Sequence, residues 1–493
     1  MYLIWLILIP FIGGLVALIA GRWSSLAARW VAMTTGVLDL VLSIYLCMLY
    51  AVNHETMVVN LPWIPQFGIS FHLELDALSM VLVLLTTSIT LIAIIGSWNE
   101  ITDRVGAFYF AILALQAGIL GVFMAFDLLL FYLFWELMLI PMYFLIGIWG
   151  HENRRKAAIK FFLFTFISGL FMLIAMIGLY VAHGQSTGIY TFDYASLIGT
   201  VMPAQYAFWI MLGFFIGFAV KLPVWPFHTW LPDAHTEAPT AGSVILAGLM
   251  LKTGAYGLLR FTVPLFPSAS VDVSSVMMGL GVAGILYGAV LAFAQTDLKR
   301  MVAYSSVSHM GFVLLGIYVG NRLALQGVVM QIICHALSTG GLFMLVGMIQ
   351  SRTGTRDLRK LGGLWATAPR LGGFTLFFGV ASLGLPGLGN FIGEFLVLIG
   401  TFQVNWLMAS VASIGMVLSA VYALRLVQAS VLGPNEGNWD LPGLSVREIL
   451  LLGAMALSLI TLGFYPKPIF SAVDSTLIHI EQSIMAGTRG GDR

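Results

Sequence analysis

Long apolar stretches alternate with short polar segments along the whole chain. Each stretch has 18 to 30 residues, and about 20 are needed for an α-helix to cross about 30 Å of hydrocarbon. Fourteen stretches meet this description: 3–20, 29–51, 75–98, 106–125, 128–149, 158–182, 205–230, 241–263, 274–294, 301–320, 322–349, 371–400, 406–432 and 447–466. The segments between them are too short for a soluble domain. The pattern predicts an all-α, polytopic membrane protein that forms one membrane domain over residues 1–493.

Proline and glycine interrupt two of these stretches, the seventh and the twelfth. Pro223 stands in AVKLPVWPF, and Pro386 stands in SLGLPGLGNF. A broken span is tolerated where it lines a cavity, and paired breaks in two halves of a chain point to a transporter's ion path. Spans four to eight and nine to thirteen each hold one break and run in opposite directions. We therefore predict two inverted five-helix repeats, each with one broken helix.

These repeats divide the chain into four parts: three N-terminal helices (1–105), a first five-helix repeat (106–263), a second, inverted repeat (274–432), and a last helix with a C-terminal tail (447–493). From Pro468 onward the tail has a weak amphipathic pattern. This pattern indicates a surface helix or a contact with a partner.

Composition excludes several classes of protein. Apolar residues make up 59% of the chain and charged residues only 9%, whereas a soluble domain carries about 25% charged residues. A cytosolic enzyme and a disordered chain are both excluded. The net charge of +1 and the lack of long basic tracts argue against nucleic acid as a partner. Cys47 and Cys334 lie in apolar stretches without metal-ligand spacing, so we expect no metal site and no bound cofactor.

Lysine and arginine concentrate in alternate loops, and such residues are enriched on the cytoplasmic side of membrane proteins. One side takes fifteen of the 23: Arg22, Arg29, Arg104, Arg154, Arg155, Lys156, Lys160, Lys299, Arg300, Arg352, Arg356, Arg359, Lys360, Arg370 and Arg447. The other side takes five: Arg260, Arg322, Lys467, Arg489 and Arg493. The distribution predicts that both termini lie on the non-cytoplasmic side.

Four ionisable residues fall well inside predicted spans: Glu136, Lys221, Lys252 and Glu394. On insertion scales each costs about 2.5–3.5 kcal/mol at a helix centre. They must therefore pair, lie in hydrated cavities or lose their charge. One interpretation is that they form ion pairs that only fix helix packing. A functional ion path is favoured, because apolar residues usually serve packing as well or better.

Histidines near these charges are candidates for proton relay. His309 and His335 lie in spans with serine and threonine neighbours, and an imidazole exchanges protons near neutral pH. The alternative is that each is a hydrogen-bonded packing residue. His228 and His235 stand near a span end beside Asp233 and Glu237, where we expect a solvated loop cluster. The segment HTWLPDAHTE is only a weak zinc candidate.

Five segments carry a resemblance to a known family: FWELMLIPMYFLIGIWG, KLPVWPFHTWLPDAHTEAPTAGSVILAG, LKTGAYGLLRF, AQTDLKRMVAYSSVSHMGFVLLGI and GLPGLGNFIGEF. They resemble the antiporter-like membrane subunits of respiratory complex I, and the match covers nearly the whole chain. The family implies fourteen helices with two inverted five-helix repeats. Sibling subunits tend to have lysine at the position of Glu394, so the glutamate favours the M-type subunits of the bacterial NADH:quinone oxidoreductase.

The resemblance also implies a role for each candidate. Glu136 and Lys221 match the carboxylate–lysine pair of the first half-channel, and Lys252 matches the central lysine. His309 and His335 match the polar axis towards the exit, and Glu394 matches the second broken helix. The implied proton path therefore consists of Glu136, Lys221, Lys252, His309, His335 and Glu394, with helix breaks at Pro223 and Pro386.

The implied function is proton translocation in a bacterial inner membrane, driven by electron transfer from NADH to quinone in other subunits. NADH, FMN, iron–sulfur clusters and quinone are expected in those partner subunits, and none is expected to be bound by this chain. Other membrane subunits, including sibling antiporter-like ones, are the expected partners. Two alternatives stay open: a subunit of a multisubunit Na⁺/H⁺ antiporter, and a scaffold that joins membrane subunits without conducting.

Overall fold

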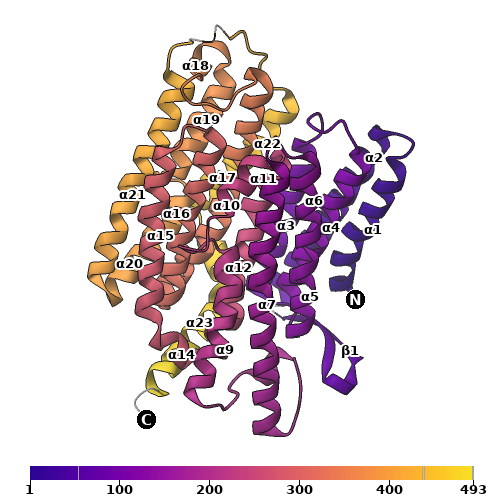
Figure 1. The fold of residues 1–493 in the computed structure, drawn as a ribbon, viewed down its shortest axis with the longest axis vertical. Helices are drawn as coiled ribbons and strands as arrows, with labels where there is room; N and C mark the ends of the chain where they lie inside the picture. Colours follow the sequence, from indigo (N-terminus) through magenta and orange to yellow (C-terminus); the bar gives the residue numbers. More distant parts are fainter. Residues whose placement is uncertain (54, 436, 438, 491–493) are drawn as a thin grey trace.

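A computed structural model describes residues 1–53, 55–435, 437 and 439–490 and shows a bundle of long helices (Figure 1). Within these residues thirteen helices are long and apolar enough to cross a membrane. They are α1 (Tyr2–Ala20), α2 (Ser25–Asn53), α3 (Ala77–Gly96), α4 (Val105–Met124), α5 with α6 (Leu128–Trp149), α7 (Arg154–Thr187), α9 (Ala204–Lys221), α11 to α13 (Thr240–Leu265), α15 (Ser274–Ala294), α16 (Leu298–Val319), α17 (Arg322–Thr353), α21 with its π-helical end (Trp406–Leu432) and α22 (Val446–Phe464).

The predicted span 371–400 is divided between two short helices, α19 (Pro369–Ser382) and α20 (Gly389–Val404). Gly384 and Gly387, in the break, have positive φ angles of 80° and 97°, which L-residues with a side chain rarely adopt. The predicted span 205–230 is also interrupted, because α9 ends at Lys221 and the chain turns before α10 (Leu231–Glu237). Both helix breaks lie at the predicted prolines.

The eighth span is continuous but not uniform. Two π-helical segments, Leu246–Met250 and Leu258–Thr262, enclose the α-helical turns of α12 (Leu251–Gly257). Such π segments widen the helix locally and occur frequently at functional sites. Lys252 follows the first segment, and Arg260 lies within the second. The hydropathy pattern of this span contains no sign of either segment.

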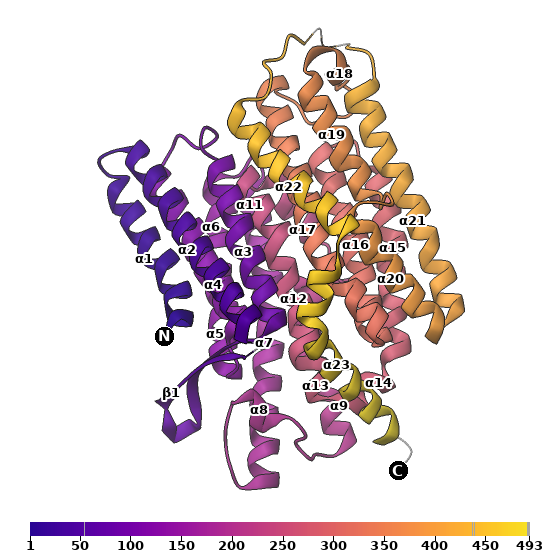
Figure 2. The same cartoon turned by 180° about the vertical axis from the view of Figure 1, so that it is seen from behind.

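A β-hairpin between α2 and α3 is absent from the sequence prediction. Its strands β1 (Met57–Ile64) and β2 (Ile69–Leu75) pair antiparallel around a short turn that ends at Gly68, whose φ is 64°. The turn sequence Pro-Gln-Phe-Gly indicates a hairpin, because two strands joined by three to five residues that include glycine are typical of one. The hairpin lies at the end of the bundle where both termini lie (Figures 1 and 2).

The amphipathic tail forms a long helix, α23 (Lys467–Gly490), as its pattern indicates. Figure 2 shows α23 crossing the back of the bundle from α22 towards α14 (Pro267–Asp272). Its contacts with the body include an ion pair between Arg322 and Asp474. The short helix α18 (Leu364–Thr367), within the basic segment 352–370, lies at the opposite end of the bundle from the termini (Figure 1).

His72 of β2 ties the hairpin to a neighbouring loop. Its Nδ1 is 2.7 Å from Oδ1 of Asp193, and its Nε2 is 3.9 Å from Oε2 of Glu74. The hydrogen bond to Asp193 raises the pKa of His72 above its usual value; burial opposes this effect, while the negative charges of Asp193, Glu74 and Asp127 add to it. The contact is therefore strongest when the imidazole is charged.

We expect this contact to make the hairpin pH-sensitive. A raised pKa in the folded state means that the stabilisation is fully present below the unfolded value of about 6.5 and is lost as the pH rises through the folded value. Limited proteolysis of the detergent-solubilised protein should therefore cut the hairpin faster at alkaline pH. The variant His72→Gln should remove most of the pH dependence; an unchanged pH profile in this variant would contradict the prediction.

Candidate functional site

Lys252 lies fully buried in the middle of the eighth span. Its Nζ donates to the carbonyl oxygen of Ala247 at 2.5 Å, within the first π segment, and lies 2.7 Å from Nδ1 of His335 on α17. The described residues provide no carboxylate partner for this lysine. Its amine is held by a backbone carbonyl and an imidazole, an arrangement that lets one proton be shared between Lys252 and His335.

His335 continues this contact to the second histidine. Its ring meets the ring of His309, on α16, edge to face with 5.5 Å between the ring centres. Nε2 of His335 is buried and has no hydrogen-bond partner among the described residues. Both rings are at most 1% exposed. The two imidazoles are thus neighbours in a buried environment, without a direct hydrogen bond between them in this conformation.

His309 connects to Glu394 in the second turn of α20. Nδ1 of His309 is 2.9 Å from Oε1 of Glu394, and the amide of Gln331 donates to the same oxygen at 3.2 Å. The other ring nitrogen of His309 is 3.1 Å from the hydroxyl of Tyr422 and 3.3 Å from that of Ser382. When Nδ1 donates to the carboxylate, Nε2 of a neutral ring is free to accept from a hydroxyl. Lys252, His335, His309 and Glu394 therefore form one row, which we call the polar row.

Glu136 and Lys221 form a separate group. Lys221, the last residue of α9, holds its Nζ 3.8 Å from the centre of the Trp135 ring and 3.5 Å from the carbonyl oxygen of Trp135. Oε1 of Glu136 faces Gly169 of α7 and has no hydrogen-bond partner among the described residues. The described part of the chain contains no ion pair between Glu136 and Lys221. Lys221 contacts Trp135, the residue before Glu136, but the two charged groups do not form an ion pair in this conformation.

The two groups meet where the helix that ends at Lys221 packs on the helix of Lys252. A Cβ on Gly254 would lie 2.7 Å from the amide nitrogen of Leu222 and 2.7 Å from the carbonyl oxygen of Phe218. The backbones of α9 and α12 are therefore in direct contact. Both lysines lie within two residues of this contact.

The interpretation of His228 and His235 as a solvated loop cluster is wrong. Both are buried, at 2% and 0% exposed, because the chain that follows the break folds back into the bundle. The His235 ring stacks on Phe343 with 4.6 Å between the ring centres, and neither of its nitrogens has a hydrogen-bond partner among the described residues. The described residues also contain no group of three or more His, Cys, Asp or Glu side chains that could hold a metal ion.

Several polar residues escaped the sequence analysis. Gln331, Ser382 and Tyr422 surround the contact of His309 with Glu394, yet uncharged polar residues in a span carry no distinguishing pattern. Asp39 is a fifth ionisable residue well inside a span, and its position in GVLDLVL was a visible signal. Arg260, which the sequence analysis counts only as a residue of the non-cytoplasmic side, lies in the second π segment of the eighth span and pairs with Asp76.

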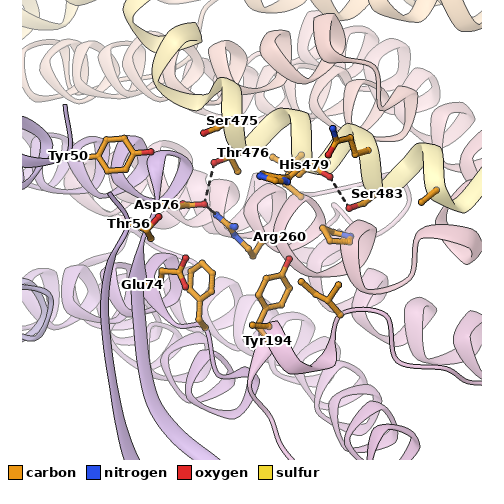
Figure 3. A pocket seen from close by; sticks show the side chains of 18 residues that line it. Tyr50, Thr56, Glu74, Asp76, Tyr194, Arg260, Ser475, Thr476, His479 and Ser483 are labelled. Carbon is orange, nitrogen blue, oxygen red and sulfur yellow. Dashed lines mark hydrogen bonds and ion pairs between the residues drawn. The ribbon is translucent and has the colours of Figure 1, made fainter. Parts of the chain in front are cut away.

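Asp76 and Arg260 lie at a cavity of about 680 Å³ between α23, the hairpin and the eighth span (Figure 3). Figure 3 shows the two side chains facing each other, with the hydroxyl of Thr476 on α23 3.4 Å from the same carboxylate. Asp76 also caps α3, because its side chain accepts from the backbone N–H of Ser79. None of the six candidate proton-path residues lines this cavity. It is therefore distinct from the polar row.

Comparison with known proteins identifies the family. A family model described as "NADH:quinone oxidoreductase/Mrp antiporter, TM" matches residues 125–419. The NADH-quinone oxidoreductase subunit M of Pseudomonas aeruginosa is 48% identical over 497 residues, covering 98% of this chain and 98% of that protein. The chain belongs to the NADH-quinone oxidoreductase subunit M family. The resemblance noted in the sequence is thereby confirmed.

Solved structures agree with this membership of the subunit M family. A chain of "Respiratory complex I from Thermus thermophilus with bound NADH" superposes with a TM-score of 0.90 at 30% identity, covering 98% of this chain and 100% of that one. A chain of the Mrp complex from Dietzia sp. DQ12-45-1b superposes with a TM-score of 0.84 at 23% identity, covering 98% of this chain and 52% of that one. The second likeness is one of fold alone. The predicted all-α, multi-pass membrane fold is confirmed.

The second helix break offers a matched test of the Glu394 position. A Cβ at Gly384 would lie 2.9 Å from Oε2 of Glu394, whereas Gly354, with a similar positive φ of 72°, has no atom within 4 Å of its Cβ position. Both alanine variants incur the left-handed backbone penalty of about 1–2 kcal/mol. Gly384→Ala should therefore lower the thermal unfolding temperature in detergent by more than Gly354→Ala. Equal shifts would mean that Glu394 is not held against the break.

Proposed function

We propose that this chain is a proton-translocating subunit of NADH:quinone oxidoreductase. It would couple electron transfer from NADH to quinone, which takes place in other subunits, to proton movement across the membrane. The observation that carries the proposal is the polar row: four titratable side chains from four different spans meet inside an apolar bundle. A row of this kind has a large insertion penalty and little value for packing, so its benefit is transport.

In this proposal the proton moves from the first unit to the second. When Glu136 and Lys221 are apart, the lysine has no counter-charge in a low-dielectric environment, which favours its neutral amine. Lys221 then gives its proton towards Lys252, whose helix is in backbone contact with its own. Lys252 passes a proton to His335, His335 to His309, and His309 to Glu394. When the Glu136–Lys221 ion pair forms again, Lys221 would take up another proton.

The parts of the chain have separate tasks in this scheme. The first five-helix unit (106–263) takes up the proton, and the second, inverted unit (274–432) releases it. Three N-terminal helices (1–105) and the last helix with its tail (447–493) flank the two units. Lys221 lies two residues before Pro223, at the end of α9, and the side chain of Glu394, in the second turn of α20, faces Gly384 in the second break. This division is supported by the position of one broken span in each unit.

We place the chain in a bacterial inner membrane, with both termini on the periplasmic side. This orientation is supported by the basic segment 352–370, which lies at the opposite end of the bundle from both termini, because Lys and Arg are enriched on the cytoplasmic side. FMN, the iron–sulfur clusters and the sites for NADH and quinone would belong to partner subunits. The translocase would therefore act through this chain without a redox centre of its own.

The alternative is a subunit of a multisubunit Na⁺/H⁺ antiporter, with which the likeness of fold to the Mrp chain is consistent. Extraction of the tagged chain from its native membrane in mild detergent would decide between the two. If NADH:quinone oxidoreductase activity and iron–sulfur signals accompany the chain, the main proposal holds. If only membrane subunits accompany it and vesicles exchange Na⁺ for H⁺ without electron flow, the antiporter function replaces it.

Removing the charge of Glu136 should weaken the coupling between NADH oxidation and proton translocation. We expect Glu136→Gln to lower the protons translocated per NADH oxidised by the assembled complex, because the lysine can no longer be loaded by an ion pair. Proton uptake by inverted membrane vesicles, measured against NADH oxidation, reports this ratio. An unchanged ratio would falsify the proposed role of Glu136.

A glycine variant tests the same position without changing any charge. A Cβ at Gly169 would lie 2.2 Å from Oε1 of Glu136, whereas the Cβ position at Gly279 has no atom within 4 Å. Gly169→Ala should displace the carboxylate and lower the proton-to-NADH ratio, while Gly279→Ala should leave it unchanged. Equal ratios in the two variants would show that the exact place of the carboxylate does not matter.

A further inference from the structure

Asp39 is a buried carboxyl group that the proposed proton path does not use. It lies midway along α2 and is 0% exposed. A carboxylate at this depth would need a cation, yet the described residues provide no ion pair for it. The helices packed against α2 are α1, α3 and α4, and none of them carries an Asp, Glu, Lys, Arg or His. No charged group therefore faces Asp39 from its neighbours.

The partner of Asp39 is a neutral amide, Gln116 of α4. Nε2 of Gln116 donates to Oδ2 of Asp39 at 2.5 Å. The other two oxygens of the pair, Oδ1 of Asp39 and Oε1 of Gln116, are both buried and both lack a hydrogen-bond partner among the described residues. In an ionised pair both of these oxygens can only accept, so both would stay unsatisfied, which is unfavourable for buried polar atoms.

Hydroxyl groups on the same helix face do not relieve this shortage. Thr35 and Ser43 lie one turn before and one turn after Asp39. The hydroxyl of Thr35 donates to the carbonyl oxygen of Val31 at 2.8 Å, and that of Ser43 lies 2.8 Å from the carbonyl oxygen of Leu40 and 2.9 Å from the hydroxyl of Thr87. Their bonds are made within α2 or to α3 and leave the Asp39–Gln116 pair alone.

We propose that Asp39 is a proton-binding site: the carboxyl group is held as a neutral acid, with the proton on Oδ1 donated to Oε1 of Gln116. The acid and the amide then form a reciprocal pair of hydrogen bonds that satisfies all four of these polar atoms. The site joins the N-terminal three helices to the first helix of the following unit. It is independent of the proposed proton path, because Asp39 makes no contact with the polar row.

Asparagine is the decisive substitution, because it reproduces the protonated acid. In Asp39→Asn the side-chain NH₂ donates to Oε1 of Gln116, and the amide oxygen accepts from Nε2, so both hydrogen bonds remain. We expect the thermal unfolding temperature of the detergent-solubilised protein with its partner subunits to stay at the parent value. Asp39→Leu and Gln116→Leu should each lower it, because one polar partner is left buried and unpaired.

Asp76 provides the matched control. Its side chain is 13% exposed, and its partner is the cation Arg260. Asp76→Asn should therefore lower the unfolding temperature, in contrast to Asp39→Asn. A drop in Asp39→Asn as large as that in Asp39→Leu would overturn the proposal.

Infrared spectroscopy tests the protonation state even if a leucine variant fails to fold. The spectrum of Asp39→Asn minus that of the parent should show the loss of one carbonyl band of a protonated carboxylic acid. This loss should be the same at every pH at which the protein stays folded. Loss of an ionised carboxylate band instead would mean that Asp39 is charged, and the proposal would be wrong.

Discussion

Water is absent from the hydrocarbon core, so every charged or polar group placed there has to find its partner inside the protein. The structure meets this requirement in three different ways. Arg260 and Asp76 form an ion pair beside a cavity at the end of the bundle. Lys252 takes a carbonyl oxygen and an imidazole in place of an anion. Asp39 takes an amide and, as we propose, a proton. Of these three residues, only Lys252 has a neutral partner, the imidazole of His335, that can receive its proton.

The interruptions of the helices follow from the same requirement. In the interior of a straight α-helix the backbone N–H and C=O groups are all hydrogen-bonded to one another, so none of them is free to bind a buried charge. Where α9 ends, Lys221 reaches the carbonyl oxygen of Trp135, and after the break between α19 and α20, Glu394 in the second turn of α20 reaches His309. In the eighth span the π segment brings the carbonyl of Ala247 within reach of Lys252. Each of these three irregularities lies next to one of the candidate charges, which gives a reason for the break or π segment at that place.

Hydropathy was sufficient for the long helices, because length and apolarity are the only conditions for crossing a membrane. Proline and glycine residues in the sequence located both breaks, because these residues act on the backbone directly. The hairpin was missed although β2, ISFHLEL, alternates apolar and polar residues as a strand does, because a search for apolar stretches of membrane-spanning length does not register this alternation. The π segments were missed because they have no distinctive composition. Gln331 and Tyr422 could not be chosen from many similar residues. The burial of His228 and His235 depends on how the chain folds back after a break, which no local pattern records.

The depth of the polar row in the membrane determines which proton-transfer steps depend on the transmembrane potential. Lys252, His309 and His335 each lie near the middle of their own span, so a proton passed along the row travels in the plane of the membrane and not across it. Such a step is nearly insensitive to a transmembrane potential, which acts at about 2.3 kcal/mol per elementary charge per 100 mV only on movement along the membrane normal. In the proposed function the voltage dependence therefore belongs to the two half-crossings that load the row and empty it. The transfer between the units is electrically silent.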